Sequence, residues 1–145
     1  MSQMSPISRA NTVSTVTEQS DPSGSTRTAV ALAGLLLVSG TAHFASPRPF
    51  DSIVPHALPG RARWWTYASG AAELAVGAAV AVPATRRVGA ACAAGLFAAV
   101  LPANVQMAVD WRDRPLPLRA AAYGRLPLQV PLVLWARKVH KAAAG

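Results

Sequence analysis

Charged side chains are scarce in this sequence. Only 14% of its 145 residues are Asp, Glu, Lys or Arg, whereas hydrophobic residues make up 52%. A soluble domain carries roughly 25% charged residues, so this chain has too few of them to cover a surface that faces water. The composition therefore argues against a soluble enzyme and favours a membrane protein of a single domain.

Cysteine, histidine and catalytic motifs are also scarce. Cys92 is the only cysteine, which excludes an internal disulfide and a dithiol redox pair. The three histidines, His43, His56 and His140, lack the spacing of metal ligands, so we predict no metal site. No nucleophile–base pair and no glycine-rich phosphate loop is present either. The chain thus has no self-contained catalytic motif, and it is at most one subunit of a membrane oxidoreductase.

The apolar residues are concentrated in four long runs. These are Thr28–Ala45, Trp64–Pro83, Val88–Val109 and Ala120–Ala136. Each run is about as long as a helix that crosses a ~30 Å hydrocarbon core. A soluble helical bundle would instead carry charges along one face of each helix, at a period of ~3.6 residues. The sequence therefore predicts an all-α fold, a bundle of four transmembrane helices.

The ends of the chain differ in composition from the apolar runs. Residues 1–27 are rich in Ser and Thr and poor in apolar residues, so we predict a disordered polar tail there. The membrane domain is expected over residues 28–138, followed by a basic C-terminal tail over 139–145. Gly40, Thr41 and Ala42 would permit signal-peptide cleavage, but the long acidic-containing stretch before them favours an uncleaved first span.

The net charge of +8 comes from basic residues at the ends of the predicted spans. Basic residues in that position meet lipid headgroups and set topology, so the expected partner is the lipid bilayer and not nucleic acid. The short Arg86–Arg87 loop and the basic C-terminal tail favour the cytoplasmic side for both termini. We therefore predict a multi-pass protein of the cell membrane.

Five polar residues stand out inside the predicted spans, where such groups are costly and usually functional or paired. They are His43, Glu73, Asn104, Gln106 and Arg125. With a rise of ~1.5 Å per residue, His43, Glu73, Asn104 and Arg125 fall in the same half of the bilayer. We predict a buried polar cluster in which Glu73 and Arg125 form an ion pair. The cluster serves either helix packing alone, or a ligand, quinone or proton-handling site.

The connection between the first two spans has a helical pattern of apolar residues. Phe50, Ile53, Val54 and Leu58 recur at the spacing of one helix face, and Pro49 suits the first turn of a helix. This pattern predicts a short interfacial helix over the polar cluster, acting as a lid or as an anchor.

Several motifs resemble those of the DoxX-like family of small membrane proteins. They are Gly40–Phe44, Ile53–Pro55, Leu58–Pro59, Ser69–Leu74, Pro83–Arg87 and Leu101–Ala108. The resemblance extends from Val30 to Ala136. It implies a four-helix membrane protein, and it links the chain to membrane redox and oxidative-stress complexes, since the family is named after a subunit associated with a thiosulfate:quinone oxidoreductase.

Two functional hypotheses follow from the sequence. In the first, the protein is a non-catalytic subunit or assembly factor of a membrane complex. In the second, it is a quinone-interacting subunit of a membrane oxidoreductase or oxidative-stress complex, in which Glu73 or His43 moves protons and Arg125 holds charge. No intrinsic cofactor is expected in either case. In the second hypothesis, electrons would therefore come from a redox partner protein.

Overall fold

A computed structural model describes residues 22–145 of the chain, and these residues are predominantly helical. The elements are α1 (Pro22–Ala45), α2 (Pro47–Asp51), α3 (Ala62–Ala81), α4 (Arg86–Asp110) and α5 (Leu116–Ala142). No strand occurs within the described range, so the predicted all-α class is confirmed.

The four long helices lie over the four apolar runs, with small differences at their ends. Helix α1 begins at Pro22, inside the segment predicted as a tail, and the rest of that segment, residues 1–21, lies outside the described residues. Proline is well suited to the first turn of a helix because its missing amide hydrogen would have no partner there. Helix α5 likewise continues to Ala142, into the predicted C-terminal tail.

The turn between α3 and α4 is held by side chains that cap α3. Arg86 donates from Nε to the carbonyl of Val80 and from Nη2 to that of Ala81, each at 3.1 Å. Thr85 donates from Oγ1 to the carbonyl of Ala79 at 2.8 Å. The last carbonyls of a helix have no partner within it, so these contacts stabilise the end of α3 and a tight reversal of the chain.

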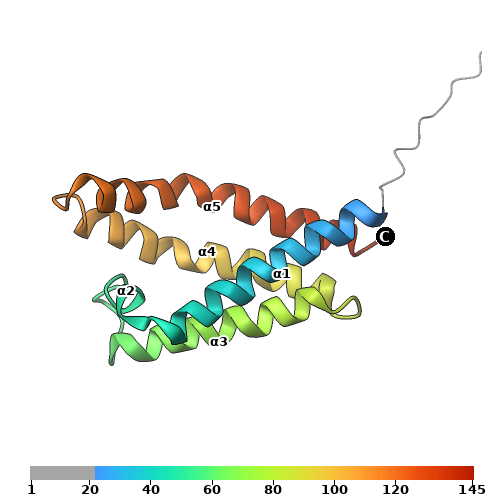
Figure 1. Cartoon of the computed structure of the whole chain (residues 1–145), viewed down its shortest axis with the longest axis horizontal. Helices are drawn as coiled ribbons and strands as arrows, with labels where there is room; N and C mark the ends of the chain where they lie inside the picture. The colour runs from blue at the N-terminus through green and yellow to red at the C-terminus, as the bar shows by residue number, and fades with distance from the viewer. Residues whose placement is uncertain (1–21) are drawn as a thin grey trace, which may run out of the picture.

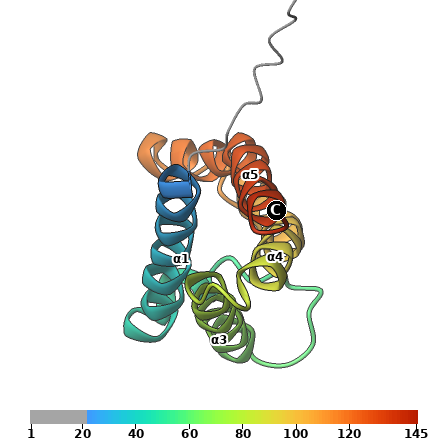
Figure 2. The ribbon, with the colours of Figure 1, turned by 90° about the vertical axis from the view of Figure 1, so that its right-hand side faces the viewer.

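The long helices form two antiparallel pairs, α1 with α3 and α4 with α5 (Figure 1). The pairs meet at the end that holds the α3–α4 turn and diverge towards the α1–α3 connection (Figure 1). Viewed from that joined end, the four helices surround a common axis (Figure 2). The indole Nε1 of Trp135 in α5 donates to the carbonyl of Thr28 in α1 at 3.2 Å, which ties the pairs together where they meet.

Helices α1 and α3 approach closely at two glycines. A Cβ atom on Gly70 would lie 2.7 Å from Cβ of His43, and one on Gly40 would lie 2.9 Å from the carbonyl oxygen of Gly70. Real side chains do not approach this closely, so the contact requires glycine at both positions. Small residues that let helix backbones meet are typical of helix contacts within membranes.

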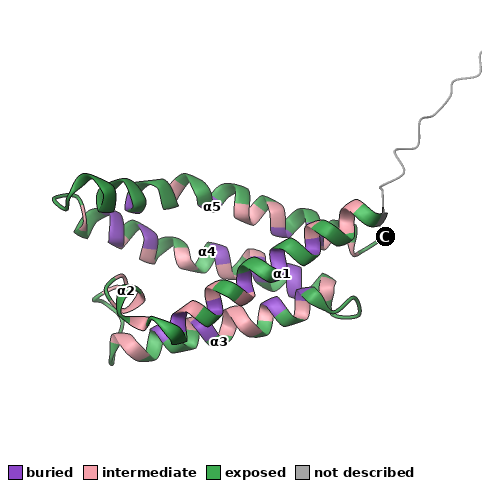
Figure 3. Cartoon of the chain, in the orientation of Figure 1, coloured by how far each residue is buried: buried purple, intermediate pink, exposed green. Residues whose placement is uncertain are grey.

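The buried and exposed surfaces are both apolar. The core lies between the helix pairs and includes Leu32, Leu36, Val80 and Val139. Exposed residues occur along every long helix (Figure 3). They include large hydrophobic ones, of which the most exposed on each helix are Val38 at 72%, Trp64 at 65%, Val88 at 68% and Leu116 at 67%. The bundle therefore has apolar faces on its outside as well as inside.

Two of the helices are long and apolar enough to cross a membrane, namely α1 from Ser23 and α4 over its full length. By length and hydropathy, two helices of the described residues could span a membrane, where the sequence predicted four. Helices α3 and α5 each carry an ionisable residue away from their ends, Glu73 in α3 and Arg125 in α5.

The predicted interfacial helix is much shorter than expected. Helix α2 ends at Asp51, so Phe50 lies in it, but Ile53, Val54 and Leu58 lie in turns beyond it. Pro55 and Pro59 explain this difference, because proline lacks an amide hydrogen and turns the preceding residue away from helical geometry. The helical pattern of apolar residues was therefore misleading after Asp51.

The glycine contact between α1 and α3 gives a first prediction. Gly70→Ala should lower the free energy of unfolding by about 1–3 kcal/mol, because the added methyl group would overpack against His43. Gly34→Ala in α1 is the matched control, since a Cβ there meets nothing within 4 Å. Unfolding in a detergent titration would measure both variants, and equal stability of the two would contradict the proposed contact.

Candidate functional site

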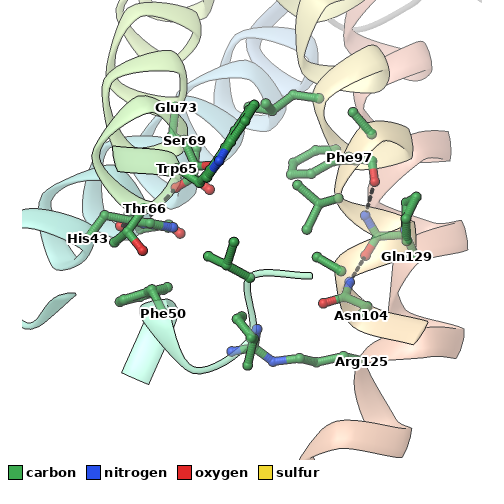
Figure 4. A pocket seen from close by; sticks show the side chains of 18 of the residues that line it. His43, Phe50, Trp65, Thr66, Ser69, Glu73, Phe97, Asn104, Arg125 and Gln129 are labelled. Carbon is green, nitrogen blue, oxygen red and sulfur yellow. Dashed lines mark hydrogen bonds and ion pairs between the residues drawn. The ribbon is translucent and has the colours of Figure 1, made fainter. Parts of the chain in front are cut away.

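A cavity of about 790 Å³ occupies the space between the diverging helix pairs (Figure 4). All four residues of the predicted polar cluster line it: His43, Glu73, Asn104 and Arg125. The four apolar residues of the predicted interfacial segment line it too: Phe50, Ile53, Val54 and Leu58. The structure thus places both predicted groups around one space.

The wall formed by α1 and α3 contains a buried His–Glu pair. Nδ1 of His43 lies 2.8 Å from the carbonyl oxygen of Ser39 and 3.7 Å from Oε2 of Glu73. The His43 side chain is 9% exposed and that of Glu73 is 13% exposed. The ring of Phe50 stacks on the His43 ring, with 3.8 Å between centroids. His43 is therefore held on three sides, by backbone, carboxylate and aromatic ring.

The wall formed by α4 and α5 contains a buried amide pair (Figure 4). Nδ2 of Asn104 donates to Oε1 of Gln129 at 2.9 Å, and Nε2 of Gln129 donates to the carbonyl of Phe97. Both amide residues are buried, Asn104 at 3% and Gln129 at 7% exposure. Gln129 was not in the predicted cluster, although its position four residues after Arg125 placed it on the same helix face.

The predicted ion pair between Glu73 and Arg125 is wrong. Both residues line the cavity, but the only ion pair of Glu73 in residues 22–145 joins it to His43. The reason is the divergence of the helix pairs, which puts α3 and α5 on opposite sides of the cavity (Figure 4). Arg125 is exposed and lies at the edge of the cavity.

The connection between α1 and α3 is attached to α3 through Asp51. Arg63 donates to Oδ2 of Asp51 from Nη2 at 2.8 Å and from Nε at 2.9 Å, and Thr66 donates to Oδ1 at 2.7 Å. The hydrogen bonds from the Arg63 guanidinium hold the pKa of the Asp51 carboxyl below its usual value. We call these three residues the Asp51 clasp. Sequence reasoning missed it, although Asp51 is the only acidic residue in the connection.

Two further contacts position the same connection over the cavity. Nε1 of Trp65 donates to the carbonyl of Pro59 at 2.9 Å. Nε2 of His56 lies 3.8 Å from Oδ2 of Asp110, near the end of α4. The connection is therefore bonded to α3 near both of its ends, and its middle reaches the other helix pair.

No group of three or more His, Cys, Asp or Glu side chains within residues 22–145 could hold a metal ion. Cys92 is exposed on α4 and does not line the cavity. The polar groups that line the cavity include a carboxylate, an imidazole, two amides and the guanidinium of Arg125, within largely apolar walls.

Comparison with known families gives one match. A family model described as a domain of unknown function, DUF8561, matches residues 32–140. The chain belongs to the DUF8561 family. The match extends from the middle of α1 nearly to the end of α5, so it includes the whole cavity. No curated protein and no solved structure matches the chain.

The resemblance to the DoxX-like family is not supported, because DUF8561 is the family that matches and no DoxX family does. Motifs such as Ser69–Leu74 consist largely of small residues, which many membrane helices use for close packing. Such motifs indicate close helix contacts and do not identify a family. The association with redox complexes that the resemblance implied loses its basis with this correction.

The amide pair gives a second prediction. Gln129→Leu should lower the free energy of unfolding by about 1–3 kcal/mol, because it leaves the buried amide of Asn104 without its partner. Gln106→Leu in α4 is the matched control, since its hydrogen bond to Asp110 is exposed, and exposed changes usually stay within about 0.5 kcal/mol. A similar loss for both variants in the same unfolding titration would contradict the assigned network.

The Asp51 clasp gives a third prediction. Asp51→Asn should speed tryptic cleavage after Arg61, because the connection loses its charged contact with Arg63. Asp113→Asn, which changes an exposed pair with Arg112, should leave that cleavage rate unchanged. Since the pKa of Asp51 is lowered, its contribution is present above the usual carboxyl range and is lost only as pH falls below it, so neutral pH is the proper condition. Equal cleavage rates of wild type and Asp51→Asn would rule out the clasp.

Proposed function

We propose that the protein is an integral membrane protein whose four long helices all cross the bilayer and whose cavity binds a lipophilic molecule. The observation that carries the proposal is the cavity itself, in which buried polar groups from two opposite walls face a largely apolar space. Ligand sites typically have volumes of about 300–1,000 Å³ and combine apolar walls with a few polar groups.

The faces of α3 and α5 support four spans over two. Several polar residues in the middle of these helices line the cavity, namely Thr66 and Glu73 from α3 and Gln129 from α5. Both helices also expose large hydrophobic side chains, including Trp64 of α3 at 65% and Val130 of α5 at 62% exposure. Polar residues inside membranes usually face the interior of a bundle, so the lower hydropathy of these two helices is compatible with crossing.

The predicted orientation in the cell membrane rests on the basic residues of the short α3–α4 turn and of the end of α5, because the opposite end carries a similar number, Arg48, Arg61, Arg63, Arg112, Arg114 and Arg119. The C-terminus lies at the same end of the bundle as the α3–α4 turn (Figure 1). This end carries Arg86, Arg87, Arg137, Lys138 and Lys141. Because basic residues near span ends favour the cytoplasm, we place this end and both termini there.

The arrangement of the cluster favours a ligand over a role in packing alone. A cluster that served only packing would be expected to close on itself, as in the predicted pair of Glu73 with Arg125. The polar groups instead form two separate sets, on α1 and α3 and on α4 and α5, with the cavity between them. This separation leaves room for a molecule between the helix pairs.

The role of such binding in the cell follows the first of the two sequence hypotheses. We keep the proposal of a non-catalytic subunit or assembly factor of a membrane complex, since no self-contained catalytic motif is evident in the sequence. The quinone-interacting alternative now rests on the size and amphipathic lining of the cavity alone. A quinone is therefore one ligand to be compared with others.

The number of spans can be tested by cysteine labelling in intact cells. In a Cys92→Ala background, Ala57→Cys would report the α1–α3 connection and Ala84→Cys the α3–α4 turn; both alanines are exposed. With four spans, a membrane-impermeant maleimide should label Ala57→Cys directly and Ala84→Cys only after permeabilisation.

The alternatives give different patterns of labelling. If only α1 and α4 crossed the membrane, both positions would lie on one side and would be labelled together, which would overturn the four-span proposal. The reverse pattern, with Ala84→Cys labelled directly, would keep four spans but refute cytoplasmic termini. In the unsubstituted protein, Cys92 is exposed on α4 and should not be labelled by the maleimide in intact membranes. It should be labelled after the membranes are solubilised in denaturant.

A further inference from the structure

Two buried oxygen atoms in the cavity have no hydrogen-bond partner. They are Oε2 of Glu73, on α3, and Oδ1 of Asn104, on α4. Each belongs to a side chain that lines the cavity, and the two lie on opposite walls (Figure 4). Buried polar atoms in proteins are nearly always paired, so these two atoms indicate what a bound molecule should supply.

The orientation of Asn104 follows from a backbone carbonyl. The carbonyl of Phe97 can only accept, so the group of Gln129 that faces it must be the NH₂ group. The remaining oxygen of Gln129 must then accept, which places the NH₂ group of Asn104 against it. Oδ1 of Asn104 is left as an acceptor on the cavity side. A flip of either amide would bring two acceptors or two donors together.

A second backbone carbonyl has the same effect on the opposite wall. The carbonyl of Ser39 can only accept, so Nδ1 of His43 carries a hydrogen. Oε2 of Glu73, 3.7 Å from Nδ1, is too far for a hydrogen bond to it. Both walls therefore offer acceptors that lack donors.

The charges around the cavity favour a neutral ligand. Glu73 would attract a cation, but Arg125 lines the same cavity without being paired to it, and a cation entering past Arg125 would be repelled. An anion drawn to Arg125 would meet the Glu73 carboxylate further in. A neutral donor avoids both conflicts.

The rim of the cavity favours a ligand with a hydrophobic tail. Leu35 of α1 and Leu128 of α5 line the cavity and are 40% and 54% exposed. In the proposed membrane arrangement these residues would adjoin lipid, so a hydrocarbon chain could extend from the cavity into the bilayer.

We infer that the cavity selects a neutral lipophilic molecule whose polar head donates hydrogen bonds, a hydroxyl-bearing head being the simplest form. The head would donate to Oε2 of Glu73 or Oδ1 of Asn104, while apolar residues such as Leu36 and Leu132 contact its carbon skeleton. This inference rests on the proposed function and adds the chemical class of the ligand.

The inference is tested with two probes that differ by one donor. The full chain in lipid nanodiscs is dialysed against 4-dodecylphenol or its methyl ether, 4-dodecylanisole, with empty nanodiscs correcting for partition into lipid. A hydrogen bond from a hydroxyl to a charged or buried acceptor is worth about tenfold or more in affinity. The phenol should therefore bind at least about tenfold more tightly than the ether.

Two variants connect the difference to the named atoms. Glu73→Gln keeps the shape of the side chain but changes the charged carboxylate into a neutral amide. Asn104→Leu removes the second acceptor. Each variant should reduce the preference for the phenol. Gln106→Leu in α4 is the control and should keep the full preference, because Gln106 does not line the cavity and its hydrogen bond to Asp110 is exposed. Thermal unfolding of all three shows that they are folded, and if Asn104→Leu unfolds, Glu73→Gln alone decides.

The source of the hydroxyl is distinguished by further probes. 1-Dodecanol against the phenol separates aliphatic from aromatic alcohols, and a decyl hydroquinone against the corresponding quinone separates a reduced from an oxidised ring. The hydroquinone should bind more tightly than the quinone, whose oxygens only accept.

Three outcomes would overturn the inference. Equal binding of phenol and ether, or of hydroquinone and quinone, would refute selection by donors while leaving a lipophilic cavity intact. Tighter binding of dodecylamine, abolished by Glu73→Gln, would show a cation site. Failure of every alkyl probe to bind would refute the ligand-binding function itself, and the inference with it.

Discussion

The contact of α1 with α3 at Gly40 and Gly70 is the constraint on which the site depends. Two helix backbones can come this close only where no Cβ intervenes, and the consequence is local. His43 lies directly above Gly70, so the imidazole is brought beside Glu73, one turn further along α3. A larger residue at either glycine would separate the helices and remove the ring from the carboxylate. The helix pair α1–α3 thus acts as one wall with a defined chemical surface.

In both walls of the cavity, a hydrogen bond to a backbone carbonyl fixes the polar side chains. In each, a backbone carbonyl orients a polar side chain: Ser39 orients His43 in one pair, and Phe97 orients Gln129 and hence Asn104 in the other. Main-chain groups within helices are not free to rotate, so they determine the polarity of the side chains bonded to them. The walls diverge from a joined end, and the Asp51 clasp brings the α1–α3 connection across the open end. Packing, capping and polarity together produce a cavity with an unpaired buried acceptor on each of two opposite walls.

Much of this arrangement could be read from the sequence, and the failures have physical causes. The length of the apolar runs and the rise of a helix determine depth, so the placement of His43, Glu73, Asn104 and Arg125 at a similar level, around one cavity, followed from their positions. Depth does not determine which helices are neighbours at a given level, and the Glu73–Arg125 pair failed for that reason. The short α2 reflects prolines that outweighed an apolar pattern. The family resemblance failed because small-residue motifs are set by helix packing and recur in unrelated chains.

The connection between α1 and α3 has a further property that concerns its backbone. Between residues 46 and 61 four positions are proline: 47, 49, 55 and 59. Each proline removes one amide hydrogen that would otherwise need a hydrogen-bond acceptor. Such acceptors are few in an irregular segment near hydrocarbon, where neither regular secondary structure nor water supplies them. The connection can therefore lie against an apolar cavity without being a helix, because its four prolines have no amide hydrogen that would need a hydrogen bond to water.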